Sequence, residues 1–327
     1  MEDPDSDYFG VLNCQYILLH EIGDGVSSKV YKSFDYFSEK KEDYAIKVFV
    51  DASSSMKKEI LFNKTIAKSQ KPFFVKYISS SSGYLVTDKT HKTHEFKNYI
   101  VFEFASKGDL FDYINCGSKG FQEQNCKVMI YKIILSIQAL HKIGICHRDI
   151  KPQNILFFGE NFEIKICDFG LSSFIYGENG KILQRGIVGT KGYMAPEIIE
   201  GKDYDGEKAD IFSLGVLLFN LLNGIQPFIT AKIINFGRKE KQLYKYINKN
   251  SDLYWIIMGL TGLPLEFKNL FIKMVAYDPN KRPTIEEILN GDWLKEITNL
   301  KPGEFKIYEE NLIKELKKRE EIIKEKG

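Results

Sequence analysis

The sequence predicts an α+β fold in two lobes: a small N-terminal lobe, mainly antiparallel sheet with one main helix, and a larger, mainly helical lobe. Alternating apolar residues and hairpin-type turns dominate up to residue 104, a pattern typical of strands. From Asp109 onward, apolar residues recur at helical spacing. The 327 residues are about twice a typical domain, and the 43% hydrophobic content is sufficient for two lobes.

The composition limits which kinds of partner and which cellular compartment we expect. The 46 basic and 44 acidic residues give a formal net charge of +2, which favours neither nucleic acid nor a membrane surface as partner. The five cysteines have no Cys-x-x-Cys spacing, so we expect free thiols. The acidic start Met1–Asp5 does not resemble a signal peptide, and the apolar stretch 211–225 is too short and polar to span a bilayer. We expect a cytoplasmic or nuclear protein that is not secreted, with 211–225 as a buried core helix.

The N-terminal part contains a glycine-rich turn and a strand lysine. Gly23–Ser28 lies between two predicted strands, and its glycines would let a hairpin fold closely over phosphates, although an ordinary turn is the alternative. Lys47 lies on the strand 44–50 that follows. Glu59, in a helix that begins near Ser54, is the acidic residue we expect to pair with it.

Two further strands are predicted at 84–87 and 99–104, joined by a polar loop. His91 and His94 in that loop have a spacing that could hold a metal, but no third ligand is apparent, so we interpret them as turn residues. The serine run 79–82 is predicted to be a loop.

The larger part has one long predicted helix with an apolar stripe from Val128 to Leu140. Short strands are predicted at 155–157 and 163–166. A buried helix is expected to start at about Lys208, which contributes to the core of the second lobe.

The chemistry is concentrated between residues 147 and 170. His147–Asn154 places a carboxylate, an ammonium and a carboxamide within eight residues, and Asp168 adds a second carboxylate before Phe169 and Gly170. Phosphoryl transfer needs a group that accepts the hydroxyl proton, a cation for the moving phosphate, and oxygen ligands for magnesium. Asp149 and Lys151 meet the first two needs, and Asn154 with Asp168 meets the third.

At these residues the sequence resembles the eukaryotic protein kinases from about Tyr16 to Leu294. Ala45–Lys47 and Ala195–Glu197 match further motifs of the family in the family's order, and Gly224–Phe228 is most similar to the calcium/calmodulin-dependent group. The resemblance implies the two-lobed protein kinase fold, ATP and Mg²⁺ as cofactors, and a protein substrate that carries serine or threonine.

The resemblance also implies residue roles. The catalytic residues would be Asp149, Lys151, Lys47, Asn154 and Asp168, with Asn154 and Asp168 as the metal ligands. The nucleotide would be bound by Ile22, Gly23, Gly25, Val30, Ala45, Lys47, Glu59, Glu103, Ala105, Asp109 and Leu156. Ser28 replaces the third glycine of the family's loop, which bears on how tightly the loop closes. Glu197 and Arg282 would form an internal ion pair.

The segment before Ala195–Glu197 lacks the usual phosphorylation site. Gly186 occupies the usual acceptor position, and Tyr176 is the only hydroxyl residue between Phe174 and Gly189. We expect activity without phosphorylation of this segment, with Arg148 unpaired or met by a carboxylate such as Glu178. The alternative is that Ser172 or Ser173 is the acceptor.

We predict an extension at 1–15, a kinase domain at 16–296 that divides near 104, and a charged helical tail at 297–327. A solvated tail helix is expected, and docking of a regulatory partner or dimerisation is the alternative. Two other functions remain open at this point: a pseudokinase or scaffold that binds nucleotide without turnover, and a small-molecule phosphotransferase on the same fold.

Overall fold

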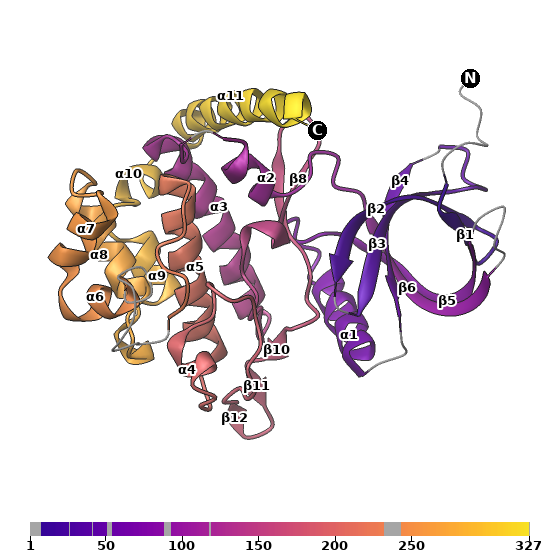
Figure 1. The fold of residues 1–327 in the computed structure, drawn as a ribbon, viewed down its shortest axis with the longest axis horizontal. Helices are drawn as coiled ribbons and strands as arrows, with labels where there is room; N and C mark the ends of the chain where they lie inside the picture. Colours follow the sequence, from indigo (N-terminus) through magenta and orange to yellow (C-terminus); the bar gives the residue numbers. More distant parts are fainter. Residues whose placement is uncertain are drawn as a thin grey trace. The chain divides into compact units, whose positions relative to one another are not determined.

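The computed structural model describes residues 8–25, 27–40, 42–50, 54–87, 93–117, 119–231 and 243–326. The chain forms two compact units. One extends to Ser106 and includes Asp168–Gly170, and the other comprises Lys107–Cys167 and the chain from Leu171 onward. The first is rich in strands and the second in helices (Figure 1), which confirms the predicted α+β class.

Six strands of the N-terminal unit close into an antiparallel barrel in the order β1-β2-β3-β4-β6-β5 (Figure 1). β1 closes it by pairing with both β2 and β5, so part of the predicted N-terminal extension belongs to the barrel. One helix, α1, accompanies these strands. The bounds are β1 Gly10–Leu12, β2 Tyr16–Gly25, β3 Ser28–Asp35, β4 Asp43–Phe49, α1 Ser54–Lys68, β5 Tyr77–Thr87 and β6 Thr93–Glu103.

Alternation along the strands fills the barrel with apolar side chains. Ile46 and Val48 on β4 are buried, and so are Tyr99 and Val101 on β6, because residues two apart share one face of a strand. Leu12 of β1 is fully buried in the same cluster. Each such side chain contributes about 1.5–3 kcal/mol on burial, so the barrel core positions the strand that carries Lys47.

The strands are longer than the sequence pattern indicated. Ser79–Ser82, predicted to be a loop, lies within β5, where Ser79 pairs with Val101 and Ser82 with Asn98. Ladder hydrogen bonds involve only the backbone, so a neighbouring strand overrides the weak strand preference of serine. The glycine hairpin is also tighter than predicted, since Gly25 pairs with Ser28 and both glycines lie in β2.

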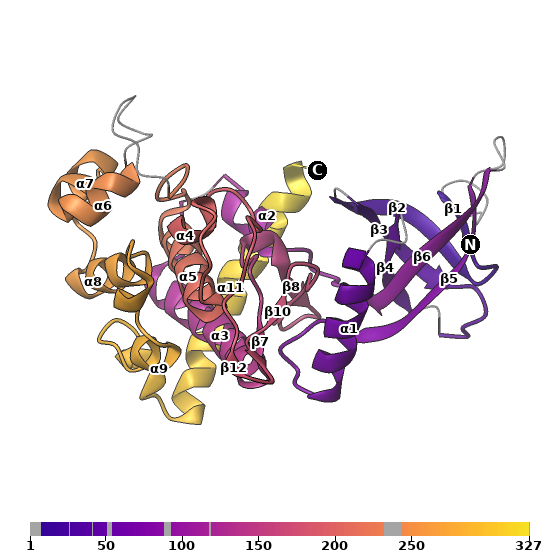
Figure 2. The ribbon, with the colours of Figure 1, turned by 90° about the horizontal axis from the view of Figure 1, so that it is seen from below.

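Helices dominate the C-terminal unit (Figures 1 and 2). Its small strand pairs are β8 with β9, β10 with β7, and β11 with β12. The bounds are α2 Leu110–Asn115, α3 Glu123–Lys142, β7 Ile145–Cys146, η1 Pro152–Asn154, β8 Ile155–Phe158, β9 Glu163–Ile166, β10 Ser173–Phe174, β11 Tyr176–Gly177, β12 Gly180–Lys181, α4 Pro196–Ile199, α5 Gly206–Asn223, α6 Leu243–Lys249, α7 Ser251–Met258, α8 Leu265–Met274, η3 Pro279–Lys281, α9 Ile285–Leu289, α10 Lys295–Thr298 and α11 Pro302–Lys326.

The helix α5 forms the centre of this unit, as predicted. Nearly all of its residues are buried, the Asp205 carboxylate accepts a hydrogen bond from the Glu207 amide at its start, and Gly224 ends it in the left-handed conformation. A Cβ at Gly215 would approach Met274 and Val275 to 2.8 and 2.9 Å, so only glycine allows α8 to pack this closely.

The C-terminal helix α11 is not the solvated tail that the charge pattern suggested. Its Leu312, Leu316 and Arg319 are buried, and the helix lies along α3 and α2 (Figure 1). These positions are four and three residues apart and therefore share one face of the helix. The apolar residues scattered among the lysines and glutamates thus form a packing stripe.

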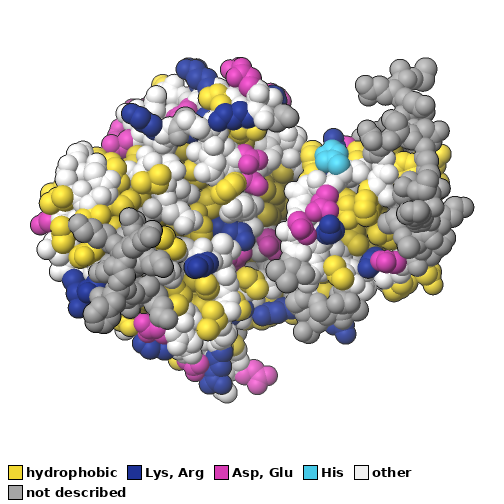
Figure 3. Space-filling view, in the orientation of Figure 1, with side chains coloured by type: hydrophobic (Ala, Val, Ile, Leu, Met, Phe, Trp, Pro, Cys, Tyr) yellow, Lys and Arg dark blue, Asp and Glu magenta, His cyan; other side chains and the backbone are white. Residues whose placement is uncertain are grey.

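The face of the molecule drawn in Figure 3 has basic and acidic side chains interspersed over both units. Among the helices of the described residues, none has the length and apolar character needed to cross a bilayer. All five cysteines are free thiols, as predicted. The side chains of His91 and His94 lie outside the described part of the chain.

Candidate active site

The strand lysine is held by two carboxylates within the N-terminal unit. Lys47 on β4 lies 2.7 Å from Glu59 Oε1 on α1 and 3.1 Å from Asp168 Oδ1. The Lys47 and Glu59 side chains are 14% and 5% exposed. Burial alone would lower the pKa of Lys47, but the Asp168 and Glu59 carboxylates outweigh it and raise the pKa above its usual value. The ammonium is therefore a fixed positive charge.

Asp168 is positioned by the two residues that follow it. Phe169 is buried and packs edge-on against Phe74 at 5.9 Å between ring centroids, which anchors the segment in the N-terminal unit. Asp168 adopts a left-handed φ of 61°. A Cβ at Gly170 would lie 3.1 Å from Glu59 Oε2, so the glycine leaves room for the carboxylate that pairs with Lys47.

The other residues of this unit that are predicted to bind the nucleotide lie on the barrel strands or just after β6. The Glu103 carboxylate accepts a hydrogen bond from the Lys76 amide at 2.7 Å. Gly23 pairs with Val30 across the hairpin, and a Cβ there would meet the Val30 side chain at 3.4 Å. Ile22 is 44% exposed beside this hairpin. Ala45 on β4 and Ala105 after β6 are partly buried.

In the C-terminal unit, three side chains converge on Asp149. Thr190 Oγ1 donates to Asp149 Oδ1 at 2.7 Å, and Lys151 Nζ lies 2.8 Å from Asp149 Oδ2 and donates to Thr190 Oγ1 at the same distance. Asn154 Nδ2 donates to the Asp149 carbonyl at 2.8 Å. The Asp149 carboxylate is only 5% exposed, so these partners fix its orientation.

The loop that carries Asp149 is supported from α5 by a buried carboxylate. Asp210 accepts the backbone amides of His147 and Arg148 at 2.8 Å each, and its Oδ2 is also 2.8 Å from His141 Nε2. Arg148 has a left-handed φ of 67°, a strained conformation for a side chain of this size. Asp210 offsets that strain and orients the loop.

Asp109 has a local structural role. Its Oδ1 accepts the amides of Phe111 and Asp112 as the N-cap of α2, and its backbone bridges to Leu156 of β8. Burial raises the pKa of Asp109 to about 6, and the nearby Asp112 carboxylate adds to the rise. The sequence alone assigned a ligand contact to Asp109 and missed the cap, although Asp followed by a helical pattern is a recognised N-cap signal.

Both expectations for Arg148 are wrong. Arg148 is neither unpaired nor met by Glu178, because its Nε donates to the Leu171 carbonyl at 2.6 Å and its Nη1 donates to the Tyr204 hydroxyl at 3.2 Å. The side chain is 8% exposed, so a buried cation is satisfied by neutral oxygens. A tyrosine more than fifty residues away in sequence gave no local signal of this contact.

The predicted ion pair between Glu197 and Arg282 is present and buried. The guanidinium donates to both carboxylate oxygens, at 2.6 and 2.7 Å, and also to the Ala276 and Lys208 carbonyls. Such a bidentate pair fixes α4 against η3 and α5.

The two predicted magnesium ligands, Asn154 and Asp168, belong to different units, and each carries a side-chain oxygen. The Asn154 amide nitrogen donates to Asp149, so its amide oxygen would be the ligand atom. Asp168 supplies a carboxylate whose side chain is 41% exposed. Carboxylate and amide oxygens are hard ligands of the kind that magnesium prefers.

Comparison with known proteins agrees with this geometry. A family model described as a protein kinase domain matches residues 16–294. The chain is 31% identical over 293 residues to the CBL-interacting serine/threonine-protein kinase 20 of Arabidopsis thaliana, covering 87% of this chain and 60% of that protein.

Two other relatives are similar over a smaller share of their own length. A protein of Dictyostelium discoideum named a probable serine/threonine-protein kinase is 30% identical over 85% of this chain and 30% of its own. The SNF-related serine/threonine-protein kinase of Homo sapiens is 34% identical over 61% of this chain and 24% of its own. The chain thus spans between 24% and 60% of these relatives. With a matching family model over most of its length, the chain belongs to the protein kinase family.

Proposed function

We propose that this kinase transfers the γ-phosphoryl group of Mg-ATP to a serine or threonine hydroxyl of a protein. The observation that carries the proposal is the network of Asp149, Lys151 and Thr190, whose atoms lie 2.7–2.8 Å apart. It presents one fixed carboxylate with one cation beside it, which is the arrangement that phosphoryl transfer requires.

Each residue has a distinct role in the proposed reaction. Asp149 orients the attacking hydroxyl and accepts its proton, and Lys151 stabilises negative charge on the phosphoryl group in flight. Magnesium, when bound, would neutralise charge on the nucleotide phosphates. Asn154 and Asp168 would be its ligands.

Lys47 contacts the α- and β-phosphates in this proposal, and Glu59 holds it in position. Ordered in advance by two carboxylates, the ammonium loses little conformational freedom when the nucleotide binds. The hairpin and the strand ends would enclose the nucleotide through Ile22, Gly23, Gly25, Val30, Ala45, Glu103, Ala105, Asp109 and Leu156.

Preference for serine and threonine is supported by two features. Lys151 contacts Thr190, and both residues lie in motifs that favour this class of kinase. The similar proteins of Arabidopsis thaliana and Homo sapiens are named serine/threonine-protein kinases. We therefore propose serine or threonine in the protein substrate.

A regulatory partner at the tail is a separate proposal. The buried face of α11 already contacts α2 and α3, so a partner would bind the opposite, charged face. The Arabidopsis relatives are named CBL-interacting kinases. We propose that this chain also binds a regulatory protein of that kind.

The pseudokinase alternative makes a different prediction. A protein that binds nucleotide without turnover would not need Lys47, Asp149 and Asp168 together, and all three are present with ordered partners. Incubation of the purified chain with labelled Mg-ATP and casein or myelin basic protein tests this. Label in the protein supports the proposal, whereas nucleotide binding without label favours a scaffold. Transfer to choline or an aminoglycoside instead would identify a small-molecule phosphotransferase.

A further inference from the structure

We propose that Tyr204 and Gln184 are positioning residues that hold the segment of residues 171–197 in its active arrangement without a phosphate. This inference rests on the proposed function, because the segment carries Thr190 of the Asp149 network. Kinases in which an arginine precedes the catalytic aspartate are commonly ordered when that arginine pairs with a phosphate on this segment. Here two neutral oxygens take the place of the phosphate.

Neutral oxygens satisfy the Arg148 guanidinium. Its Nε and Nη1 donate to the Leu171 carbonyl and the Tyr204 hydroxyl, at 2.6 and 3.2 Å. Tyr204 is buried, and the Arg148 side chain keeps both contacts within the C-terminal unit. A phosphate is thus not required to satisfy this cation.

Backbone hydrogen bonds join Tyr204 to Gln184 in the segment of residues 171–197. The backbone N–H of Gln184 donates to the backbone carbonyl of Tyr204 at 2.7 Å, and the backbone N–H of Tyr204 donates to the backbone carbonyl of Gln184 at 3.0 Å. The Gln184 side chain is buried, and its Nε2 donates to the Phe174 and Ile182 carbonyls at 2.9 and 3.2 Å. Gln184 therefore joins both ends of the β11–β12 hairpin to the residue that contacts Arg148.

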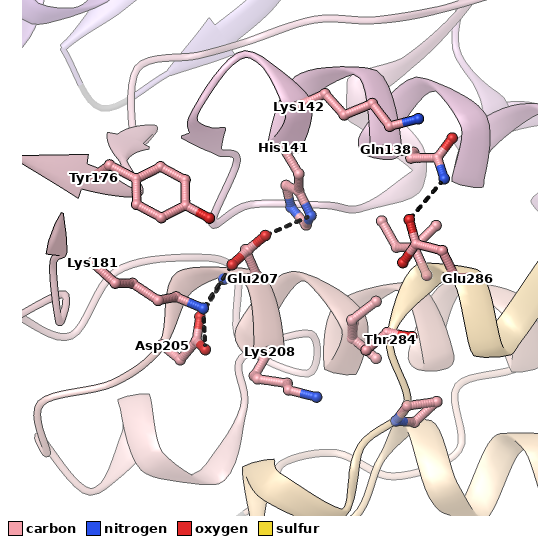
Figure 4. A pocket seen from close by; sticks show the side chains of 13 residues that line it. Gln138, His141, Lys142, Tyr176, Lys181, Asp205, Glu207, Lys208, Thr284 and Glu286 are labelled. Atoms are coloured by element: carbon pink, nitrogen blue, oxygen red, sulfur yellow. Dashed lines mark hydrogen bonds and ion pairs between the residues drawn. The ribbon is translucent and has the colours of Figure 1, made fainter.

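The hairpin is also tied to α5 by an ion-pair cluster at a cleft of about 390 Å³ (Figure 4). Lys181 lies 2.6 Å from both Asp205 and Glu207, at the start of the helix. Figure 4 shows Lys181 directed at these two carboxylates, with Glu207 also facing His141. Partly exposed pairs contribute little singly, but this cluster attaches the base of the hairpin, where Lys181 pairs with Tyr176, to the start of α5.

The segment is thus fastened at three points without a modified residue. The sequence contains no serine or threonine from Phe174 to Gly189, and Tyr176, the one hydroxyl residue there, is 57% exposed on β11. The usual acceptor position is Gly186, which cannot be phosphorylated. Contacts of unmodified residues hold the segment instead.

The first test uses the wild-type chain. The protein is treated with phosphatase, mass spectrometry verifies that Ser172, Ser173 and Tyr176 carry no phosphate, and initial rates are measured on myelin basic protein with dilute enzyme. We expect undiminished kcat. Loss of most activity, restored by rephosphorylation of the segment, overturns the inference but leaves the proposed function intact. Absence of transfer from both forms overturns both.

The second test removes the contacts. Tyr204→Phe deletes one hydroxyl, and Gln184→Glu replaces a donor with a carboxylate that faces two carbonyl oxygens. Each should reduce kcat about tenfold or more, with the KM for ATP unchanged because neither residue contacts the nucleotide-binding residues. The matched control is Tyr244→Phe, which removes another buried hydroxyl of this unit, bonded to the Val275 carbonyl. It should change the melting temperature without reducing kcat.

A double substitution separates positioning from general destabilisation. In an Arg148→Met background the partner of the Tyr204 hydroxyl is gone, so Tyr204→Phe should lower kcat no further. Full kcat in the single variant Tyr204→Phe, or additive losses in the double variant, would overturn the inference. The phosphatase result decides the question if Tyr204→Phe does not fold.

Discussion

At the scale of single residues, the Lys47 ammonium combines a proposed role in catalysis with a role in stability. It is buried between Glu59 and Asp168, and the Glu59 side chain is only 5% exposed. Removing the ammonium would leave a buried carboxylate without its partner, which lowers stability.

We predict that Lys47→Met lowers kcat by several orders of magnitude and also lowers the free energy of unfolding by about 3 kcal/mol. The double variant Lys47→Met/Glu59→Gln removes the stranded charge, so it should regain most of the stability and none of the activity. Denaturant midpoints and initial rates measure the two effects. Equal stability of the single variant and the wild type would contradict this account of the ion pair.

Asp109 gives a pH-dependent prediction. Burial raises its pKa to about 6 in the folded state, from an ordinary value of 3.8. The folded state therefore retains a proton that the unfolded state releases, so this group makes the protein less stable as the pH rises from about 4 to 6, and the loss is complete above 6.

Asp109→Asn should consequently stabilise the protein by about 1 kcal/mol at pH 7.5, because asparagine still caps α2 and carries no charge. The gain should disappear near pH 4. Thermal unfolding of both proteins across this range measures it, and a constant difference at every pH would rule out the titration of Asp109. A rise in the KM for ATP in the same variant would support its proposed contact with the nucleotide.

At the scale of elements, α11 is fixed to the C-terminal unit by one buried cation. The Arg319 guanidinium donates to the carbonyls of Tyr113, Lys119 and Gly120 at 2.9–3.1 Å and lies over the Phe121 ring at 3.9 Å. Glu315, one turn earlier, accepts from the same guanidinium at 2.8 Å. The charge is thus satisfied by the end of α2 and the loop before α3.

Arg319→Ala should lower the free energy of unfolding by about 2–4 kcal/mol, since three carbonyls, of which that of Tyr113 is buried, lose their donor and the packing on Phe121 is lost. The neighbouring exposed Lys318→Ala is the matched control and should stay within about 0.5 kcal/mol of wild type. Urea unfolding followed by circular dichroism compares them. Equal midpoints for the two variants would show that α11 does not stabilise the unit.

The helices and strands that were predicted correctly are those whose hydrophobic pattern lies within their own sequence. The run from Ala209 to Leu221 is mainly apolar and is buried throughout, and alternation on β4 matches its burial. Ser79–Ser82 and the packed face of α11 were not foreseen, because serine in a strand and a sparse apolar stripe acquire their structure from partners distant in the sequence.

At the scale of the whole molecule, the motifs indicated the proposed catalytic residues, and the structure shows which side chains contact them. Asp149 and Asp168 could be named from the sequence because they stand in kinase motifs, and Glu59 because it is the acidic residue in the helix that follows the strand of Lys47. The contact of Arg148 with Tyr204 could not, since it joins two parts of the C-terminal unit that are separated by many residues. The α+β class was predictable, whereas the closure of the barrel through β1 was not.

The central claim is that Asp149 carries phosphoryl transfer from ATP to a serine or threonine hydroxyl. The most direct measurement compares wild type and Asp149→Asn with labelled Mg-ATP and myelin basic protein, followed by phosphoamino-acid analysis. We predict phosphoserine or phosphothreonine with the wild type, and a rate at least about a thousandfold lower for a variant that melts at nearly the same temperature. A variant that retains more than about a tenth of the wild-type kcat, a loss of less than about 1.4 kcal/mol in barrier, would contradict the claim.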